Sequence, residues 1–491
     1  MTMAAPASAF TRLRMAVLGA MALASLPMFL AYPGQVIVLF AFCLAAIALF
    51  AAASFGRLSY FALFLACFLI LGFWAKLDLY WVLGTPLLEP VGSFPDTAEA
   101  WDRALLASTA GLAGLAAGIG AAKLLDRRNL VPDFPVLAAP APGPALGVLF
   151  ALSAAAAVAL FVANFHYAIL KIGTVPRIPL HPYLYAIVSF TVGWGAALWL
   201  GTLAFWMVGA RRAPADFPVY VLAVEGAAAA LSMGSRAQMI LHMAACLAAL
   251  ATCMRAFGWR VAPLRLLLAS GFAALLFAAS LVGVSLDRIS SFYGPPPPSA
   301  AKRAEAPSGG GIGADRPAGL APSGAVSDAA VRRMAGEVMQ LFVGRWIGIE
   351  GVLAVSSHPD LGPDTLRAGF SEDPRLGVDT MYQRLARSIY KRSEQFVFLT
   401  VPGPIAVLFY GGSMTLVAFG MAVLFLAGYA VERFCDSWVR NPASSAVVGA
   451  ALAYLVAQTM FPRTLLYFSV ELVLALALIG GFRMGVRRWA R

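Results

Sequence analysis

Long apolar runs, joined by short polar connections, follow one another along the whole chain. Each run has about the 20 residues that an α-helix needs to cross the hydrocarbon core of a bilayer. The pattern therefore predicts an all-α polytopic membrane protein with about twelve transmembrane helices. The runs lie near residues 15–32, 35–55, 58–83, 104–125, 146–170, 184–208, 218–234, 238–254, 264–286, 404–431, 444–461 and 464–482.

The composition excludes several other classes of protein. The 491 residues are 61% hydrophobic and only 12% charged, with a mean hydropathy of +0.80. A soluble protein carries about 25% charged residues and about 45–50% apolar ones. A chain this apolar could not cover its core with polar surface in water. A cytosolic globular enzyme, a disordered scaffold and a secreted disulfide-rich domain are therefore excluded.

Positive charges in the connections predict the orientation of the helices. If the N-terminus is inside, the inner connections and both termini hold 17 of the 36 Lys and Arg residues, whereas the short outer loops hold six. Cations accumulate on the cytoplasmic side of membrane proteins. Both termini are therefore expected in the cytoplasm, and the net charge of +12 indicates topology rather than binding to nucleic acid.

One outer loop is long enough to form an extramembrane, periplasmic domain. It spans residues 287–400, between an N-terminal bundle of about nine helices (1–286) and a C-terminal bundle of about three (401–491). Residues 293–327 are so rich in Pro, Gly, Ala and Ser that they cannot bury enough apolar area to order themselves, which predicts a disordered linker. Residues 328–395 are expected to form short helices associated with the membrane.

The stretch Val338–Val355 in this loop is apolar enough to lie in the membrane interface, to re-enter the membrane or to cross it. If it crossed, the chain would have about fourteen spans. Arg345 and Glu350 lie inside the stretch, and charged side chains that face lipid are costly. We therefore prefer twelve spans.

The most distinctive cluster of this loop is Gly344-Arg-Trp-Ile-Gly-Ile-Glu-Gly351. A site for a lipid-linked sugar at the membrane surface would use Arg345 for phosphate, Trp346 for stacking on a sugar ring and Glu350 as a base. His358 follows closely and is a second candidate base. The alternative interpretation is an interfacial helix whose charged side chains extend to the headgroups.

Cations also occur in two short outer connections. Gly234-Ser235-Arg236 follows the seventh span, and a guanidinium held there by a tight turn is suited to bind a phosphate with two hydrogen bonds. Lys171 and Arg177 lie in another outer loop. An ordinary interfacial anchor is the alternative role for Arg236.

Arg384, Arg387 and Lys391 recur at intervals of three and four residues, so a helix would place them on one face. Such a strip could bind a pyrophosphate or an acidic glycan. A solvated helix face, or contact with lipid headgroups, would explain the same pattern.

Ionisable residues inside the spans are functional candidates by default. Glu225 and Glu471 are the clearest, although a buried acid paired for helix packing is an equal alternative. His166 and His242 resemble packing residues more than ligands. The five cysteines and the known metal-binding and nucleotide-binding motifs give no pattern that requires a metal or another cofactor.

Two stretches resemble a known family: Phe342–Ser357 (FVGRWIGIEGVLAVSS) and Pro402–Ser413 (PGPIAVLFYGGS). They look like bacterial oligosaccharide repeat-unit polymerases, the O-antigen polymerase (Wzy-type) group. About twelve spans, an early Gly-Ser-Arg and a large late external loop fit the same group. The linker at 293–327 is not a feature that we associate with this family.

The resemblance implies a metal-independent glycosyltransferase of the bacterial inner membrane. It would transfer a growing glycan from undecaprenyl pyrophosphate to the next lipid-linked repeat unit on the periplasmic face. Arg236 and Arg345 would stabilise the departing pyrophosphate, with Glu350 or His358 as the base. The other cations and Trp346 would bind the substrate, and a flippase and a chain-length regulator of the same pathway would be further partners.

Three other functions fit the sequence less well. A glycan ligase, which moves the finished chain to another acceptor, shares the architecture, the donor and the cationic loop. A transporter or flippase would have charged residues distributed through the spans and broken helices at the midplane. A non-catalytic assembly partner would tolerate the loss of Arg345 or Glu350.

Overall fold

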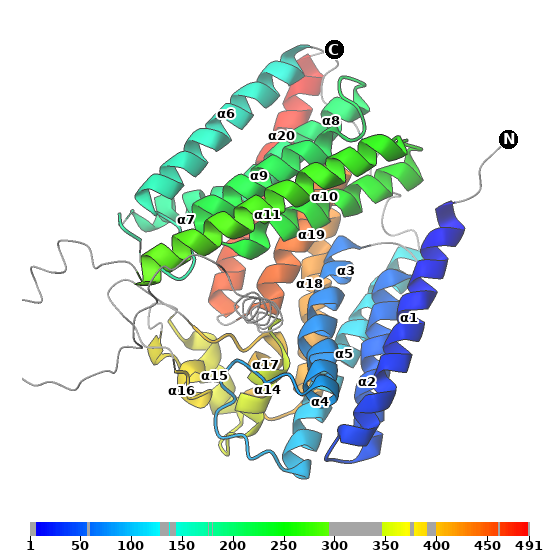
Figure 1. The fold of residues 1–491 in the computed structure, drawn as a ribbon, viewed down its shortest axis with the longest axis vertical. Helices are drawn as coiled ribbons and strands as arrows, with labels where there is room; N and C mark the ends of the chain where they lie inside the picture. Colours follow the sequence, from blue (N-terminus) through cyan, green and yellow to red (C-terminus); the bar gives the residue numbers. More distant parts are fainter. Residues whose placement is uncertain are drawn as a thin grey trace, which may run out of the picture.

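The computed structural model is all-helical in the residues that it describes (Figure 1). Ten helical segments are long and apolar enough to cross a membrane, and two further apolar helices are shorter. These findings confirm an α-helical multi-pass membrane protein; the count of twelve spans and the orientation stay predictions. The structure describes residues 6–55, 59–127, 137, 144–174, 176–178, 180–293, 346–373, 378–389, 399–459 and 462–489.

The transmembrane helices lie close to the predicted apolar runs. Two of the long segments are composite, because a π-helical segment interrupts each of them. The helices are α1 (Pro6–Ala31), α2 (Val36–Ser54), α3 (Tyr60–Leu69) with η1 (Ile70–Ala75) and α4 (Lys76–Leu83), α5 (Ala98–Arg127), α6 (Pro144–Tyr167), α7 (Pro182–Phe190) with η2 (Thr191–Gly195) and α8 (Ala196–Gly209), α9 (Phe217–Met233), α10 (Arg236–Ala256), α11 (Pro263–Tyr293), α18 (Met414–Trp438), α19 (Pro442–Ala457) and α20 (Pro462–Trp489).

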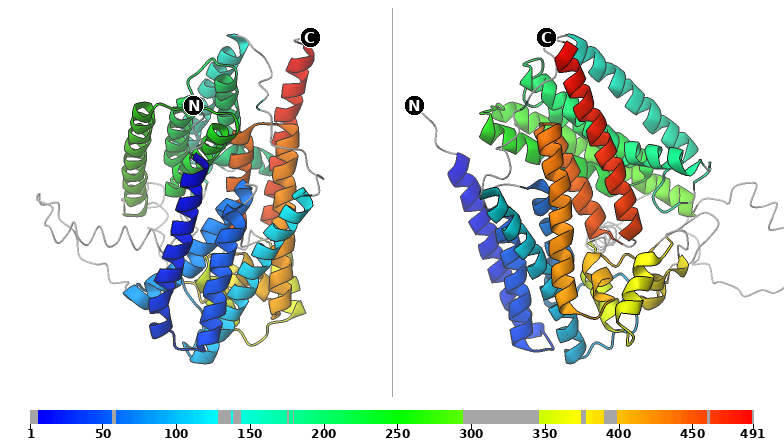
Figure 2. Two further views of the ribbon diagram at one scale, coloured as in Figure 1. Left: turned by 90° about the vertical axis from the view of Figure 1, so that its right-hand side faces the viewer. Right: turned by 180° about the vertical axis from the view of Figure 1, so that it is seen from behind.

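Figures 1 and 2 show these helices in two groups, with α19 between them. The first group contains α1–α5 and α18, and the second contains α6–α11 and α20. α19 packs against α3, α8, α10 and α18, and almost all of its residues are buried. Its many Ala, Ser and Gly residues allow this, because small side chains let helices approach closely.

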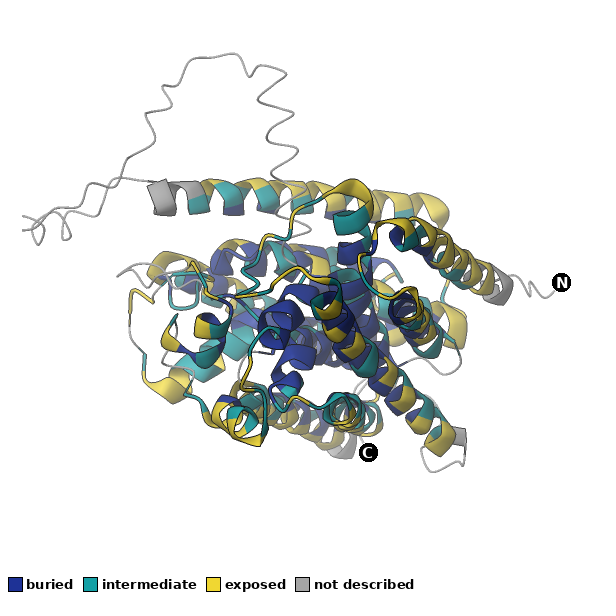
Figure 3. Cartoon of the chain, turned by 90° about the horizontal axis from the view of Figure 1, so that it is seen from below, coloured by how far each residue is buried: buried dark blue, intermediate teal, exposed yellow. Residues whose placement is uncertain are grey.

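Burial follows the pattern of a protein dissolved in lipid. Buried residues gather at the centre of the molecule, and the outer helix faces are exposed (Figure 3). Many of the exposed side chains are large and apolar, such as Leu30, Leu152, Leu267 and Leu478. Apolar side chains can face outward at no cost where the surroundings are hydrocarbon.

Four short helices of the large loop pack on the ends of the membrane helices predicted to be periplasmic (Figure 1). They are α14 (Ile349–Ser356), α15 (Pro363–Ser371), α16 (Met381–Leu385) and α17 (Pro404–Phe409). Two glycines make this packing close. A Cβ atom on Gly72 would lie 1.9 Å from the backbone oxygen of Ile347, and one on Gly351 would lie 2.0 Å from that of Pro402. Only a residue without a side chain fits at either contact.

The predicted span at 404–431 is wrong in one respect, because the structure divides it. α17 ends at Phe409, and the chain turns at Gly412, which has a φ of 68°. Ser413 then caps α18 by accepting a hydrogen bond from the amide of Leu416 at 3.3 Å. The first part of the apolar run therefore belongs to the loop, and the membrane helix begins at Met414.

Two predictions about the large loop lie outside the described residues. The first is the disordered linker at 293–327, of which the structure describes only Tyr293 at the end of α11. The second is the start of the helical region predicted for residues 328–395, because residues 328–345 are not described. The short helices expected in the rest of the loop are present from α14 to α16.

Candidate functional site

Each of the two π-helical segments lies beside a buried acid–base pair. η1 leads directly into Lys76, which pairs with Glu350 of the loop. η2 contains Gly193, whose backbone oxygen contacts a second pair in the membrane bundle. π segments disturb the regular hydrogen bonding of a helix and occur frequently at functional sites. Neither segment was visible in the sequence, because the apolar runs continue through both.

Lys76 and Glu350 connect the transmembrane bundle to the loop. Nζ of Lys76 lies 2.5 Å from Oε1 of Glu350 and donates to the backbone oxygen of Trp346 at 2.6 Å. Both charged side chains are 3% exposed. Removing one partner of a buried ion pair leaves the other charge uncompensated, which costs about 3–5 kcal/mol. The pair therefore holds the start of α14 against α4.

Other polar groups enclose the carboxyl of Glu350. The backbone amide of Glu89 donates to it, and the hydroxyl of Tyr382 lies close to both carboxyls. Burial raises the pKa of Glu350 above its usual range, and the Lys76 ammonium opposes this effect. At 3% exposure the carboxyl has almost no surface for a sugar substrate, so its position favours a structural role over that of a base.

The other predicted residues of this cluster differ in accessibility. Trp346 is half-buried, and Arg345 lies outside the described residues. His358 is half-buried just beyond the end of α14, and its Nδ1 accepts a hydrogen bond from the amide of Asp360 at 3.1 Å. In the neutral ring the proton is therefore on Nε2, which makes His358 a hydrogen-bond donor in this arrangement.

The predicted helical strip of cations is not formed by the described residues. α16 ends at Leu385, and Arg387 has a φ of 50°, outside the helical region. Arg384 and Arg387 are both exposed, and the guanidinium of Arg384 donates to the backbone oxygen of Asp379 at 2.6 Å. Lys391 lies outside the described residues. The prediction failed because the residue spacing gives a helical face only where a helix continues.

Cations from three elements surround the turn between α9 and α10. Gly234 makes the turn with a φ of 63°, and Arg236 begins α10. Nζ of Lys171 lies 2.6 Å from a carboxylate oxygen of Asp287. The guanidinium of Arg288 donates twice to the backbone oxygen of Gly234, at 3.1 and 2.8 Å. The turn thus brings together three cations and one acid.

Hydrogen bonds fix the geometry of this turn. The side-chain amide of Asn164 donates to the backbone oxygens of Leu170 and Ser232, at 3.0 Å each. The amide of Ile172 donates to the oxygen of Met233 at 2.8 Å. The loop that carries Lys171 is therefore attached to the end of α9. Arg177, also predicted to bind substrate, lies exposed further along the same loop.

Lys171 and Arg236 were predicted from the sequence, whereas Asp287 and Arg288 were missed. The apolar run of this span ends near residue 286, so the two residues were assigned to the long loop. In the structure α11 continues to Tyr293 and carries them beside the turn. One signal could have found them, because the two charged residues follow the apolar run directly with no helix-breaking residue between.

The second acid–base pair lies inside the membrane bundle. Nδ1 of His242 is 2.7 Å from Oε2 of Glu225, and Nε2 is 3.0 Å from the backbone oxygen of Gly193 in η2. Gln238 donates to the same oxygen and lies 2.9 Å from His242 Nε2. Glu225 and His242 are both buried. His242, interpreted from the sequence as a packing residue, therefore has an acidic partner. Glu471, the other predicted acid, is half-buried on α20.

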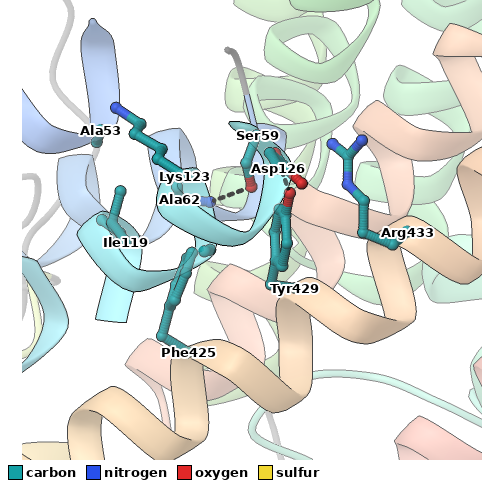
Figure 4. Close-up of a pocket in the computed structure, with 10 residues that line it drawn as sticks. Ala53, Ser59, Ala62, Ile119, Lys123, Asp126, Phe425, Tyr429 and Arg433 are labelled. Carbon is teal, nitrogen blue, oxygen red and sulfur yellow. Dashed lines mark hydrogen bonds between the residues drawn. The ribbon is translucent and has the colours of Figure 1, made fainter. Parts of the chain in front are cut away.

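A third polar cluster joins α3, α5 and α18 at the ends predicted to be cytoplasmic (Figure 4). The carboxylate of Glu432 accepts hydrogen bonds from the Ser59 hydroxyl at 2.6 Å and from the amide of Tyr60 at 2.8 Å, so it caps the start of α3. The hydroxyl of Tyr429 donates to Asp126 at 2.6 Å. These groups satisfy one another across three helices, which indicates a structural network.

Within the described part of the chain, no group of three or more His, Cys, Asp and Glu side chains could hold a metal ion. Comparison with known proteins identifies no relative: no family model, no curated protein and no solved structure matches the chain. The residues themselves must therefore support any functional assignment.

Proposed function

We propose that the chain is a glycosyltransferase of the bacterial inner membrane. It would polymerise undecaprenyl-pyrophosphate-linked oligosaccharide repeat units into a surface polysaccharide on the periplasmic face. The observation that carries the proposal is the cationic turn formed by Lys171, Gly234, Arg236 and Arg288. The proposal also rests on the resemblance of the stretches Phe342–Ser357 and Pro402–Ser413 to this group of polymerases.

The chemistry of the donor explains why such a turn would be needed. When the glycan leaves its carrier, negative charge develops on the pyrophosphate, and cations fixed in place beforehand stabilise it. Among the described residues, the turn brings the cations Lys171, Arg236 and Arg288 to one place with the acid Asp287. A sugar pyrophosphate is already activated, so the transfer requires neither a nucleotide nor a bound metal.

The start of α10 adds to this preference for an anion. The side chain of its N-cap residue, Ser235, makes no capping hydrogen bond. The first amide groups of a helix and its dipole together favour a negative group at that end. Arg236 lies at the same end and can donate two parallel hydrogen bonds to a phosphate. A pyrophosphate at this turn would therefore meet a guanidinium and helix amides from one element.

The loop would hold the acceptor. In this proposal Glu350 is a positioning residue, because its pairing with Lys76 fixes Trp346 and the residues beside it on the membrane bundle. Arg345, Arg384 and Arg387 would contact the second pyrophosphate or the glycan. His358 is half-buried rather than enclosed, and it could act as the base only once its Nδ1 is released from the amide of Asp360.

The test is the pattern of lipid-linked glycans in a deletion strain complemented with single variants. We expect that the deletion and Arg236→Ala both accumulate single repeat units, with a loss of activity of about 10²–10³-fold for the variant. Arg345→Ala is expected to behave in the same way. The matched control is Arg463→Ala, an exposed arginine that also begins a helix at the outer side but lies on α20.

Each other outcome has a definite meaning. If long chains form but stay on the lipid carrier, the protein is a glycan ligase and not a polymerase. Unchanged glycans in the deletion strain would exclude both enzymes. If Arg463→Ala were as defective as Arg236→Ala, the turn could not be assigned to the active site.

One observation favours a second candidate, a transporter or flippase of the lipid-linked unit. Glu225 and His242 form a buried, ionisable pair in the membrane bundle, beside a helix interrupted by η2. Interrupted helices and intramembrane acids are common at transport sites. Reconstituted vesicles distinguish the two functions: a flippase moves labelled lipid-linked units across the bilayer and depends on Glu225, whereas a polymerase moves none.

A further inference from the structure

Asp287 places a negative charge inside the cationic turn. Its Oδ1 accepts a hydrogen bond from Nζ of Lys171 at 2.8 Å, and its Oδ2 lies 2.6 Å from the same atom. The carboxylate therefore holds the ammonium with both oxygens. A carboxylate repels a pyrophosphate that is placed beside it. If the turn binds the pyrophosphate of the carrier, the presence of an acid on one of its cations requires an explanation.

Lys171 does not depend on Asp287 for its position. The backbone amides of its two neighbours, Leu170 and Ile172, each donate a hydrogen bond at 2.8 Å, the first to a side chain of α6 and the second to the end of α9. The stem of the lysine passes close to the turn, because a Cβ atom on Gly234 would lie 3.6 Å from its Cγ. The loop would therefore present Lys171 at the turn even without the acid.

The end of α11 is also held at the turn by a separate contact. The guanidinium of Arg288 donates twice to the backbone oxygen of Gly234. The adjacent residue Asp287 therefore reaches the turn whether or not it pairs with Lys171. The side chains of Lys171 and Asp287 are 12% and 24% exposed, and ion pairs that are open to solvent add little net stability. The pair is thus not needed to build the turn, and exchanging the carboxylate for another anion costs little.

We propose that Asp287 is an internal competitor for Lys171, which a pyrophosphate must displace in order to bind. This inference rests on the proposed polymerase and concerns the selectivity of its donor site. A pyrophosphate displaces the carboxylate because it has more charge and more oxygens, so that it can bind Lys171 and Arg236 together. A lipid monophosphate competes less well. After the glycan has been transferred, the carboxylate returns to Lys171 and promotes release of undecaprenyl pyrophosphate.

The test measures binding of undecaprenyl pyrophosphate and of undecaprenyl phosphate to the purified full-length protein in detergent. Asp287→Asn keeps the size of the side chain and removes the competing charge. We expect it to bind undecaprenyl pyrophosphate about tenfold more tightly, the usual scale for one charge-assisted contact, and undecaprenyl phosphate more tightly still. Asp287→Glu keeps the charge and is expected to bind both ligands as wild type does. Asp364→Asn, which removes an exposed acid of α15, is the matched control and is expected to change binding by less than about twofold.

A double-mutant cycle tests whether Asp287 acts through Lys171. Lys171→Gln is expected to weaken the binding of undecaprenyl pyrophosphate about tenfold, and adding Asp287→Asn to this variant is expected to have no further effect. Kinetics give a second readout: in Asp287→Asn both KM and kcat fall, because the substrate binds more tightly and the carrier leaves more slowly. The Tm of each variant without ligand shows whether it folds. Asp287→Ala, with the same expectations, replaces an Asp287→Asn protein that does not fold.

Three results would overturn the proposal. Unchanged or weaker binding in Asp287→Asn would make the ion pair a support of the turn. Equal tightening in Asp364→Asn would assign the effect to the overall charge of the outer surface. Tightening that persists without Lys171 would show that Asp287 acts on another group. The proposed polymerase fails separately, through unchanged glycans in the deletion strain, and in that case the measured affinities still decide whether Asp287 competes for Lys171.

Discussion

Each of the two π-helical segments lies beside a buried pair of an acid and a basic side chain, but the two pairs have different partners. η1 leads into Lys76, whose ammonium binds Glu350 from the loop. η2 presents the oxygen of Gly193 to His242, which pairs with Glu225 on the neighbouring helix. The first pair joins segments distant in the sequence, and the second joins the two helices of one hairpin. Both pairs are almost completely buried.

The two pairs differ in what they connect. The Lys76–Glu350 pair joins α14 of the loop to α4, so its loss would release the loop from the membrane bundle. The Glu225–His242 pair lies within one hairpin, where Gln238 and the oxygen of Gly193 contact the other side of the His242 ring. The comparison separates an attachment between distant segments from a polar cluster inside the membrane bundle.

The largest expected effect is on the attachment at η1. Lys76→Met leaves the carboxylate of Glu350 buried without its cation, and we expect a loss of stability of about 3–5 kcal/mol. Thermal unfolding of the purified protein and limited proteolysis of the loop measure it. The control is the double variant Lys76→Met/Glu350→Leu, which removes both charges and is expected to recover most of the loss. A single variant as stable as wild type would mean that the pair does not hold the loop.

The second prediction concerns the pair at η2. Glu225→Gln keeps the size of the side chain but removes the charge that His242 contacts, and we expect a loss of about 1.5–3 kcal/mol, the range for hydrogen bonds to charged groups. Thermal unfolding again provides the measurement. Glu471→Gln, on a half-buried acid of α20, is the control and is expected to change stability by less than about 0.5 kcal/mol. Equal effects of the two variants would contradict a special role for the pair.

The apolar runs were enough to predict most of the fold. They located the membrane helices and the large loop, because length and hydropathy alone decide whether a segment can cross a bilayer. The break after Phe409 was missed, since Tyr410 and two glycines continue an apolar run. The π segments were missed for a related reason: hydrophobicity does not report whether a helix has an extra residue in one turn.

The site was predicted in part. Arg236 and Lys171 were each identified, but only the fold brings them to the same turn. The pairing of Lys76 with Glu350 depends on how the loop folds back, which no local pattern reports. The other pair was more accessible to sequence reasoning. Glu225 lies nine residues before Gly234 and His242 lies eight after it, so a tight hairpin places both at similar depth.

The third prediction compares one glycine from each π segment. A Cβ atom on Gly72 of η1 would lie 1.9 Å from the backbone oxygen of Ile347, whereas one on Gly193 of η2 would have its nearest neighbour, Cε of Met233, at 4.0 Å. We expect Gly72→Ala to cost about 1–3 kcal/mol, as overpacking usually does. Gly193→Ala is its matched control and is expected to be tolerated. Thermal unfolding of both variants decides whether close approach to the loop is specific to η1.

The smallest expected effect is the dependence of loop attachment on pH. Burial raises the pKa of the Glu350 carboxyl. This carboxyl therefore stays protonated in the folded protein at a pH where it has already lost its proton in the unfolded chain, in which the pKa of glutamic acid is about 4.3. Stability therefore falls as the pH rises from about 4.3 to the raised value, by about 1.4 kcal/mol for each unit of the difference, and is constant above it. Unfolding measured across this range should show the slope in wild type. The slope should be weaker in Glu350→Gln, because glutamine cannot titrate. An unchanged slope in this variant would assign the pH dependence to another acid, such as Glu372, whose pKa burial also raises.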